Sequence, residues 1–185
     1  MKKFALVLAA AAMVAGFASA SYAETSGSAT ASVFVTVNPN IGIVVNSAVV
    51  DAGTVQTGDF SADIGFRVDA NSQFINAFAS ASALYKGDNP NGTDVAPIEL
   101  NLSKGIAIVP TQGNEVNAGD NIAAFSVTGD PIGLYPTMKT ETITLESSQN
   151  NHFSQDVNMK VYWTQADPEK PQGQYSGKVA LYVLL

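Results

Sequence analysis

TASVFVTVNPNIGIVV, residues 30–45, places a valine at every second position until a proline interrupts the pattern. One face of the extended segment carries Val33, Val35 and Val37. The opposite face carries Ser32, Phe34 and Thr36. This period of two is typical of a half-buried β-strand. The sequence therefore predicts a strand over residues 30–37. This strand could complete a sheet of its own molecule or a sheet of a neighbouring molecule, and the pattern leaves both possibilities open.

A break separates this strand from the apolar run that follows it. Pro39 lacks a backbone N–H and restricts the residue before it, so Asn38, Pro39 and Asn40 are predicted to form a hinge. The apolar run from Ile41 to Val45 comes next, and residues 24–29 in front of the valines are small and polar. The mature chain is expected to begin with a loose tip, an apolar strand and a hinge.

Residues 1–23 have the pattern of a secretory signal peptide. Lys2 and Lys3 precede an apolar stretch from residue 4 to residue 17, which is too short to span a bilayer. Small residues favour cleavage between Ala23 and Glu24, and cleavage after Ala20 is the alternative. If neither cut occurs, the segment would remain as an uncleaved anchor. The chain is therefore expected to be exported.

The composition favours an acidic, cysteine-free, all-β protein. Sixteen acidic residues stand against nine basic ones, so no basic surface for nucleic acid is expected. The absence of cysteine excludes thiol catalysis and disulfides. Turn signals recur every eight to fifteen residues, and no segment carries a sustained helical stripe, which indicates a β-sandwich.

Further strands are expected at alternating or apolar runs along the chain. They are residues 48–50, 60–68, 74–85, 98–102, 106–109, 122–127, 138–145, 157–163 and 175–185. The run 74–85 could also form a helix because it is rich in alanine, but its period of two favours a strand. Loops are expected at residues 86–97 and 111–119, and irregular connections at residues 129–131 and 133–136.

The alternation also predicts which side chains face the core. The inward sets are Ile64, Phe66 and Val68; Ile98, Leu100 and Leu102; Ile143 and Leu145; Val157, Met159, Val161 and Trp163; and, in the last strand, Val179, Leu181, Val183 and Leu185. Trp163 shares this parity, so it is expected in the core and not as a platform for a sugar. Arg67 falls on the opposite face of this strand. We expect it to be an exposed surface charge, and the alternative is that it anchors an acidic ligand.

Residue patterns for catalysis are weak. His152 is the only histidine and lies in a polar, turn-like run, so a solvated histidine is expected there and not a catalytic base. The carboxylate pairs Asp59/Asp63 and Asp167/Glu169 could serve acid–base chemistry but read more simply as acidic surface. No catalytic, cofactor-binding or metal-binding residue is assigned, and the chain is not expected to be an enzyme.

The loop 86–97 contains oxygen ligands suited to calcium. Asp88, Asn91 and Asp94 lack the spacing and the terminal glutamate of an EF-hand. Turn formation is the preferred interpretation of these residues, with calcium binding left open.

Both ends of the chain resemble one protein family. The export signal, the valine strand and the Val37-Asn38-Pro39-Asn40-Ile41 sequence are similar to the start of mature major subunits of colonization-factor fimbriae, the alpha class of chaperone–usher pili. Residues 173–179, GQYSGKV, followed by an apolar strand, resemble the end of those subunits. The resemblance covers about thirty residues, and the missing cysteines agree with it.

The resemblance implies an immunoglobulin-like β-sandwich that lacks one strand. Residues 1–23 would be the signal peptide, residues 24–38 a donor-strand extension and residues 39–185 the pilin domain. A periplasmic chaperone would first fill the missing position, and the N-terminal strand of the next copy would replace it at an outer-membrane usher. The C-terminal strand would belong to the surface used in chaperone binding and assembly.

Two functions of different classes follow. The first is a structural subunit of an extracellular fimbria that polymerises by strand exchange and serves surface attachment. The second is a monomeric secreted β-sandwich that binds a carbohydrate or a surface partner.

Overall fold

The computed structural model describes residues 31–111, 113–115 and 122–185, and the predicted signal peptide lies outside this range. The chain divides into two units, residues 1–37 and residues 38–185. The described part of the first unit, residues 31–37, contains no strand. The strand predicted over residues 30–37 is therefore not formed in residues 31–37, and none of the described strands pairs with them.

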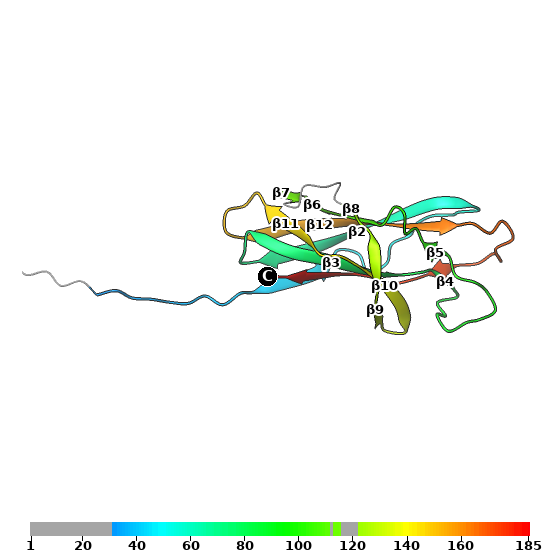
Figure 1. Cartoon of the computed structure of the whole chain (residues 1–185), viewed down its shortest axis with the longest axis horizontal. Coiled ribbons are helices and arrows are strands. Elements are labelled where there is room, and N and C mark those ends of the chain that lie inside the picture. Colours follow the sequence, from blue (N-terminus) through cyan, green and yellow to red (C-terminus); the bar gives the residue numbers. More distant parts are fainter. Residues whose placement is uncertain (1–30, 112, 116–121) are drawn as a thin grey trace, which may run out of the picture. The chain divides into compact units, whose positions relative to one another are not determined.

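The second unit is all-β, and its strands pair antiparallel (Figure 1). Within the described residues it contains no helix, so no helix there has the length and apolar character needed to cross a membrane. Alternating apolar residues explain the long strands. In β12, for example, every second side chain from Phe153 to Gln165 is buried.

The first sheet has the order β1-β2-β12-β6-β8, and β5 also pairs with β12. Its strands are β1 (Ile41–Val45), β2 (Gly58–Ala70), β12 (Phe153–Gln165), β6 (Ile106–Pro110), β8 (Ile122–Ala123) and β5 (Glu99–Leu100). β2 and β12 pair over their whole length and form the centre of this sheet.

The second sheet is built on β3. Its strands are β7 (Gly113–Glu115), β11 (Ile143–Ser147), β3 (Phe74–Ser82), β10 (Tyr135–Thr140), β9 (Phe125–Ile132) and β14 (Val179–Leu184). Ala77 pairs with Ile143 of β11 and with Val183 of β14, so β11 and β14 lie on opposite sides of β3. β4 (Tyr85–Lys86) and β13 (Tyr175–Ser176) form a small separate ladder.

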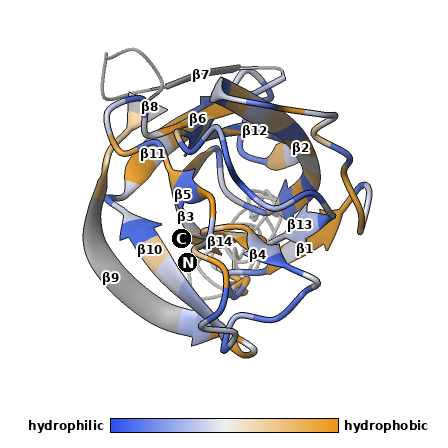
Figure 2. Ribbon diagram, turned by 90° about the vertical axis from the view of Figure 1, so that its right-hand side faces the viewer, coloured by the Kyte–Doolittle hydropathy of each residue, from blue (hydrophilic) through white to orange (hydrophobic). Residues whose placement is uncertain are grey.

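Both sheets contribute to one hydrophobic core, an arrangement consistent with a β-sandwich. Figure 2 looks along the strands and shows the sheets curling. Val68, Val157 and Met159 of the first sheet are fully buried, as are the three alanines of β3, Ala77, Ala79 and Ala81. Small side chains on β3 allow close approach of the facing side chains. The prediction of a strand for the alanine-rich run is confirmed.

The inward sets predicted for β2, β11 and β12 are confirmed, Trp163 included. Leu102 was predicted inward but is exposed, because β5 ends at Leu100 and residues 102–104 form a turn. The strand predicted at residues 48–50 is absent, and β9 runs through residues 129–131, where an irregular connection was predicted. β7 falls inside the predicted loop 111–119, of which only residues 111 and 113–115 are described.

The single strand predicted over residues 138–145 is two strands. Met138 pairs with Ala81 in β10, whereas Ile143 pairs with Ala77 in β11, so the register along β3 shifts by one residue between them. Because of the shift, Met138 and Ile143 both lie opposite alanines on the same face of β3, although one has an even and the other an odd residue number. A prediction based on a strict alternation of side chains cannot detect such a shift.

Candidate functional site

The predicted hinge is held to the turn after β2 by one asparagine. The side-chain amide of Asn71 donates to the carbonyl oxygen of Asn38 at 2.9 Å, and its Oδ1 accepts from the N–H of Asn40 at 2.8 Å. The backbone N–H of Asn71 donates to the carbonyl oxygen of Asn40 at 3.2 Å. We call these three bonds the Asn71 clamp. No pattern in the sequence pointed to this contact.

The segment before the hinge exposes its apolar side chains almost completely. Val33, Phe34, Val35 and Val37 are 92%, 91%, 88% and 75% exposed. The three valines lie on one face of the extended segment and Phe34 on the other, so apolar surface is exposed on both faces.

β1 forms one edge of the first sheet. Ala70 of β2 pairs with Ile41 on one side and with Phe153 of β12 on the other, and β1 pairs with β2 alone among the described residues. Its backbone groups on the other side are therefore available to a further strand.

Two side chains of β1 face inward but are only partly covered. Ile43 and Val45 lie opposite Val68 and Phe66, which are buried, so all four belong to the core-facing side of the sheet. Ile43 and Val45 are nevertheless 37% and 40% exposed. The core is thus incompletely covered along β1.

β14 forms the corresponding edge of the second sheet and approaches β1 in space. In the described part of the chain it pairs only with β3. Leu181 and Val183 are buried as predicted, and Val179 is half-buried. Leu185 follows the end of β14 and is exposed, so it does not share their position. We call the adjacent unpaired sides of β1 and β14 the open edge.

The outer face of β14 carries an aromatic pair. The rings of Phe78 and Tyr182, directly opposite each other on β3 and β14, stack with centroids 4.8 Å apart. The ammonium group of Lys139 lies 4.6 Å from the centroid of Phe78. This pair faces away from the core, since the neighbouring residues on each strand face inward.

The GQYSGKV sequence, residues 173–179, anchors the start of β14. Gly173 has a φ of +145°, and an added Cβ on Gly177 would lie 2.6 Å from the carbonyl oxygen of Ala83. The N–H of Lys178 donates to Oγ of Ser82, and the N–H of Ser82 donates to the carbonyl of Lys178. Gly177 thus permits a close approach that a side chain would obstruct, and Gly173 adopts a backbone conformation that other residues rarely take.

The candidate catalytic residues do not assemble into a reactive site. His152 is exposed and its Nδ1 contacts the carbonyl of Asn150 at 3.0 Å. Asp59 accepts from Thr164 and pairs with Lys104 at 3.0 Å, whereas Asp63 faces Lys160. The hydrogen bond from Thr164, followed by that from Lys104, lowers the pKa of Asp59. Asp167 accepts from the backbone N–H of Glu169 in a surface turn.

The loop 86–97 uses its first carboxylate for internal hydrogen bonds. Asp88 accepts from the hydroxyls of Tyr135 and Ser176, the latter at 2.7 Å. The bond from Tyr135, then that from Ser176, lowers the pKa of Asp88. An open pocket of about 150 Å³ next to it is lined by Lys86, Asn89, Gly92, Asp94 and Val95. No three acidic or histidine side chains of the described residues gather as a metal site.

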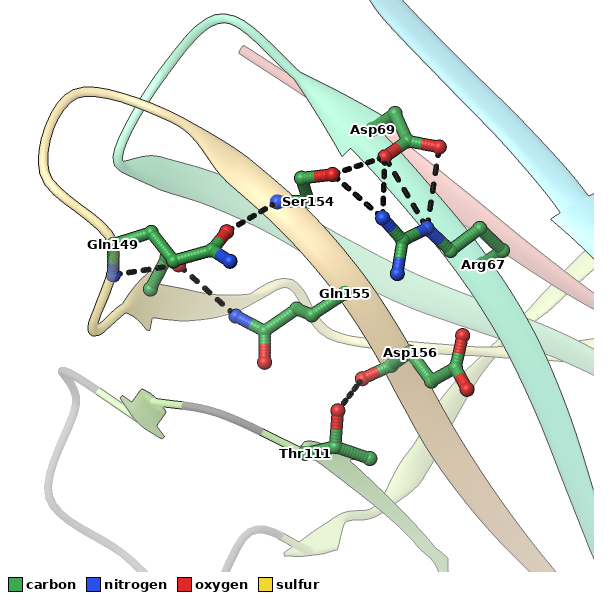
Figure 3. A network of polar contacts seen from close by, with 8 residues as sticks. Arg67, Asp69, Thr111, Gln149, Ser154, Gln155 and Asp156 are labelled. Atoms are coloured by element: carbon green, nitrogen blue, oxygen red, sulfur yellow. Dashed lines mark hydrogen bonds and ion pairs between the residues drawn. The ribbon is translucent and has the colours of Figure 1, made fainter.

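Arg67 lies half-buried on the outer face of the first sheet, which is the face predicted for it. Its guanidinium group pairs with Asp69 at 2.9 Å and donates to Oγ of Ser154 at 2.6 Å (Figure 3). Ser154 in turn donates to Asp69. The charge of Arg67 is thus balanced by its neighbour on β2, which leaves little reason to assign it an external ligand.

Comparison with known proteins finds no matching family model, no matching curated protein and no matching solved structure.

Proposed function

We propose that this protein is a structural subunit of an extracellular fimbria and that copies join by exchange of the N-terminal strand. One observation carries the proposal: an exposed, alternating apolar segment lies next in sequence to a sheet edge whose inward-facing Ile43 and Val45 are only partly covered. The donor is residues 30–37 of one copy, and the acceptor is the open edge of another. The completed body is an immunoglobulin-like sandwich.

The chemistry of donor and acceptor is complementary. An added strand forms main-chain hydrogen bonds with an unpaired edge, and its alternate side chains enter the apolar interior. Val33, Val35 and Val37 would cover Ile43 and Val45 of β1 and continue the buried row of Leu181 and Val183 on β14. Ser32, Phe34 and Thr36 would point outward.

The apolar contribution is large enough for a stable joint. Burying three valines contributes about 1.5–3 kcal/mol each, or roughly 5–9 kcal/mol before the cost of ordering the segment. Pairing of the backbone adds to this and removes an edge that would otherwise promote aggregation. A joint of this strength dissociates slowly, as a fibre that withstands force requires.

We further propose that the chain is exported and that two proteins of the export route, a chaperone and an usher, bind it before assembly. A subunit with an open apolar edge needs protection before assembly, which a periplasmic chaperone would give by covering β14. An outer-membrane usher would then bring the donor of the next copy to the open edge. The fimbria would serve attachment to a surface.

The second candidate is a monomeric secreted binding module, and the Phe78–Tyr182 pair with Lys139 favours it. Tyr182 is exposed and Phe78 is half-buried, and an aromatic pair of this kind beside a cation is suited to contact with a carbohydrate or protein partner. In this case the N-terminal segment would be an ordinary first strand or a linker.

Two substitutions on neighbouring residues test the proposed function. Val35→Asp would place a carboxylate in the apolar interior of the acceptor, which is costly without a partner. Thr36→Asp is the matched control, because it adds the same charge on the outward face. We expect Val35→Asp to reduce multimers resistant to cold detergent at least about tenfold and Thr36→Asp to leave them near the native level.

Electrophoresis of unheated and boiled samples of the mature chain, with electron microscopy of the same material, measures this outcome. Ladders that collapse on boiling and disappear only in Val35→Asp support strand exchange. Equal multimer yields in both variants, or a native chain that stays monomeric at high concentration, contradict it and favour the binding module.

A further inference from the structure

The Asn71 clamp occupies backbone groups that a reversal of the chain at the hinge would need. The carbonyl oxygen of Asn38 and the N–H of Asn40 both bond to the side chain of Asn71. The carbonyl oxygen of Asn40 bonds to the backbone of Asn71. Asn40 and Asn71 are the next pair in register after Ile41 and Ala70, so the clamp extends the β1–β2 ladder beyond its last strand pair.

Local sequence alone favours a turn at this point. Asn38-Pro39-Asn40-Ile41 has asparagine at the first position, proline at the second and asparagine at the third, a favoured pattern for a β-turn. Such a turn would join residues 31–37 to β1 as a hairpin with a short loop. Residues 38–40 form no turn in the structure.

The clamp competes with two of the hydrogen-bonded turns that could form around Pro39. A turn over residues 36–39 lacks a donor, because Pro39 has no N–H. A turn over residues 37–40 needs the N–H of Asn40, and a turn over residues 38–41 needs the carbonyl of Asn38. Asn71 holds both of these groups.

We propose that Asn71 is a positioning residue that prevents the N-terminal segment from folding back onto its own open edge and so directs it to a second copy. This inference rests on the proposed strand exchange. It adds the residue that decides whether the segment pairs with its own molecule, giving a closed monomer, or with another copy, giving a multimer. The partner that the clamp selects is the open edge of another copy of this protein.

The chemistry of the clamp identifies informative variants. Asn71→Ala removes both side-chain bonds. Asn71→Asp keeps an acceptor for Asn40 but loses the donor to Asn38 and places a negative charge beside that carbonyl. Asn91→Ala, an exposed asparagine of the loop 86–97, is the matched control.

The experiment refolds the mature full-length chain from denaturant at one concentration and separates monomer from multimer by size. Chymotrypsin cleavage after Phe34 then reports whether the segment in the monomer is exposed. We expect Asn71→Ala to raise the fraction of monomer with a protected segment about tenfold, since it loses two hydrogen bonds. Asn71→Asp should show a smaller rise, and Asn91→Ala should match the native chain.

Each other outcome counts against the proposal. Protected monomer at the native level in Asn71→Ala overturns the clamp, as does monomer whose segment remains cleavable, which indicates simple destabilisation. If Asn71→Ala does not fold, a native level of protected monomer in Asn71→Asp overturns it. Native chain without strand-exchanged multimers refutes the proposed function itself and the clamp with it.

Discussion

At the scale of single residues, Ser82 of β3 forms hydrogen bonds with β12 and with the residue that precedes β14. Its carbonyl oxygen accepts from the indole N–H of Trp163 at 3.0 Å, which links the two sheets. Its hydroxyl accepts from the backbone N–H of Lys178 at 2.9 Å, which fixes the start of β14. Gly177 is packed against this point, so the position of the open edge depends on a residue without a side chain.

Gly177→Ala tests this dependence. The added methyl group would lie 2.6 Å from the carbonyl of Ala83 and 2.7 Å from Oγ of Ser82, so the backbone must shift. We expect the free energy of unfolding to fall by about 1–3 kcal/mol. Denaturant unfolding in the Val35→Asp background measures the effect without interference from multimers.

Gly42→Ala is the control for this substitution. Gly42 lies in β1, and its nearest neighbour to an added Cβ is the carbonyl of Asp69 at 4.0 Å. A change within about 0.5 kcal/mol is expected there. Equal effects of the two substitutions would contradict the role assigned to Gly177.

At the scale of elements, the loop 86–97 is fastened to β10 and β13 by Asp88. The lowered pKa of Asp88 means that its ionised form is favoured in the folded state. A carboxyl group of this kind stabilises the fold above its ordinary pKa of 3.8, and the stabilisation is lost as the pH falls through the lower folded value. Acid should therefore loosen this loop.

Asp88→Asn tests the loop attachment. Asparagine suits the φ of +60° at this position and keeps an acceptor, so mainly the charge is removed. We expect a melting temperature a few degrees below that of the native chain at about pH 6, with the difference shrinking as the pH falls below the ordinary pKa of 3.8 and vanishing once Asp88 is protonated in the folded state. Thermal unfolding across this range measures it, with Asp94→Asn in the same loop as control. A difference independent of pH would refute the assignment.

Strand pattern was predictable from sequence where side chains alternate without interruption. β2 and β12 follow the period of two over their whole length, and the alanine run of β3 was predicted as a strand for the same reason. The register shift between β10 and β11 was not predictable, because it depends on which residues of β3 they pair with. Leu102 was misassigned because a turn ends β5 early.

At the scale of the whole molecule, two sheets share a core, and their edge strands β1 and β14 approach each other with unpaired sides. The candidate donor was visible in the sequence, because Val33, Val35 and Val37 alternate in front of a proline. Only one of the two strands that form the acceptor could be predicted from the sequence. β14 reads as an apolar strand, but the exposure of Ile43 and Val45 depends on the absence of a further strand beside β1.

The Asn71 clamp could not be found from sequence. Asn71 is thirty-one residues from Asn40 along the chain, and an asparagine between two strands ordinarily indicates only a turn. Its partners become apparent once β1 and β2 are paired in register, because the ladder then brings the hinge beside it.

A structure of the purified multimers by electron cryomicroscopy tests the central claim most directly. The account predicts that residues 31–37 of one copy lie as a strand beside β1 and β14 of the next, with Val33, Val35 and Val37 directed into its core. Multimers in which this segment pairs with its own β1, or lies unpaired while other surfaces join the copies, would contradict it.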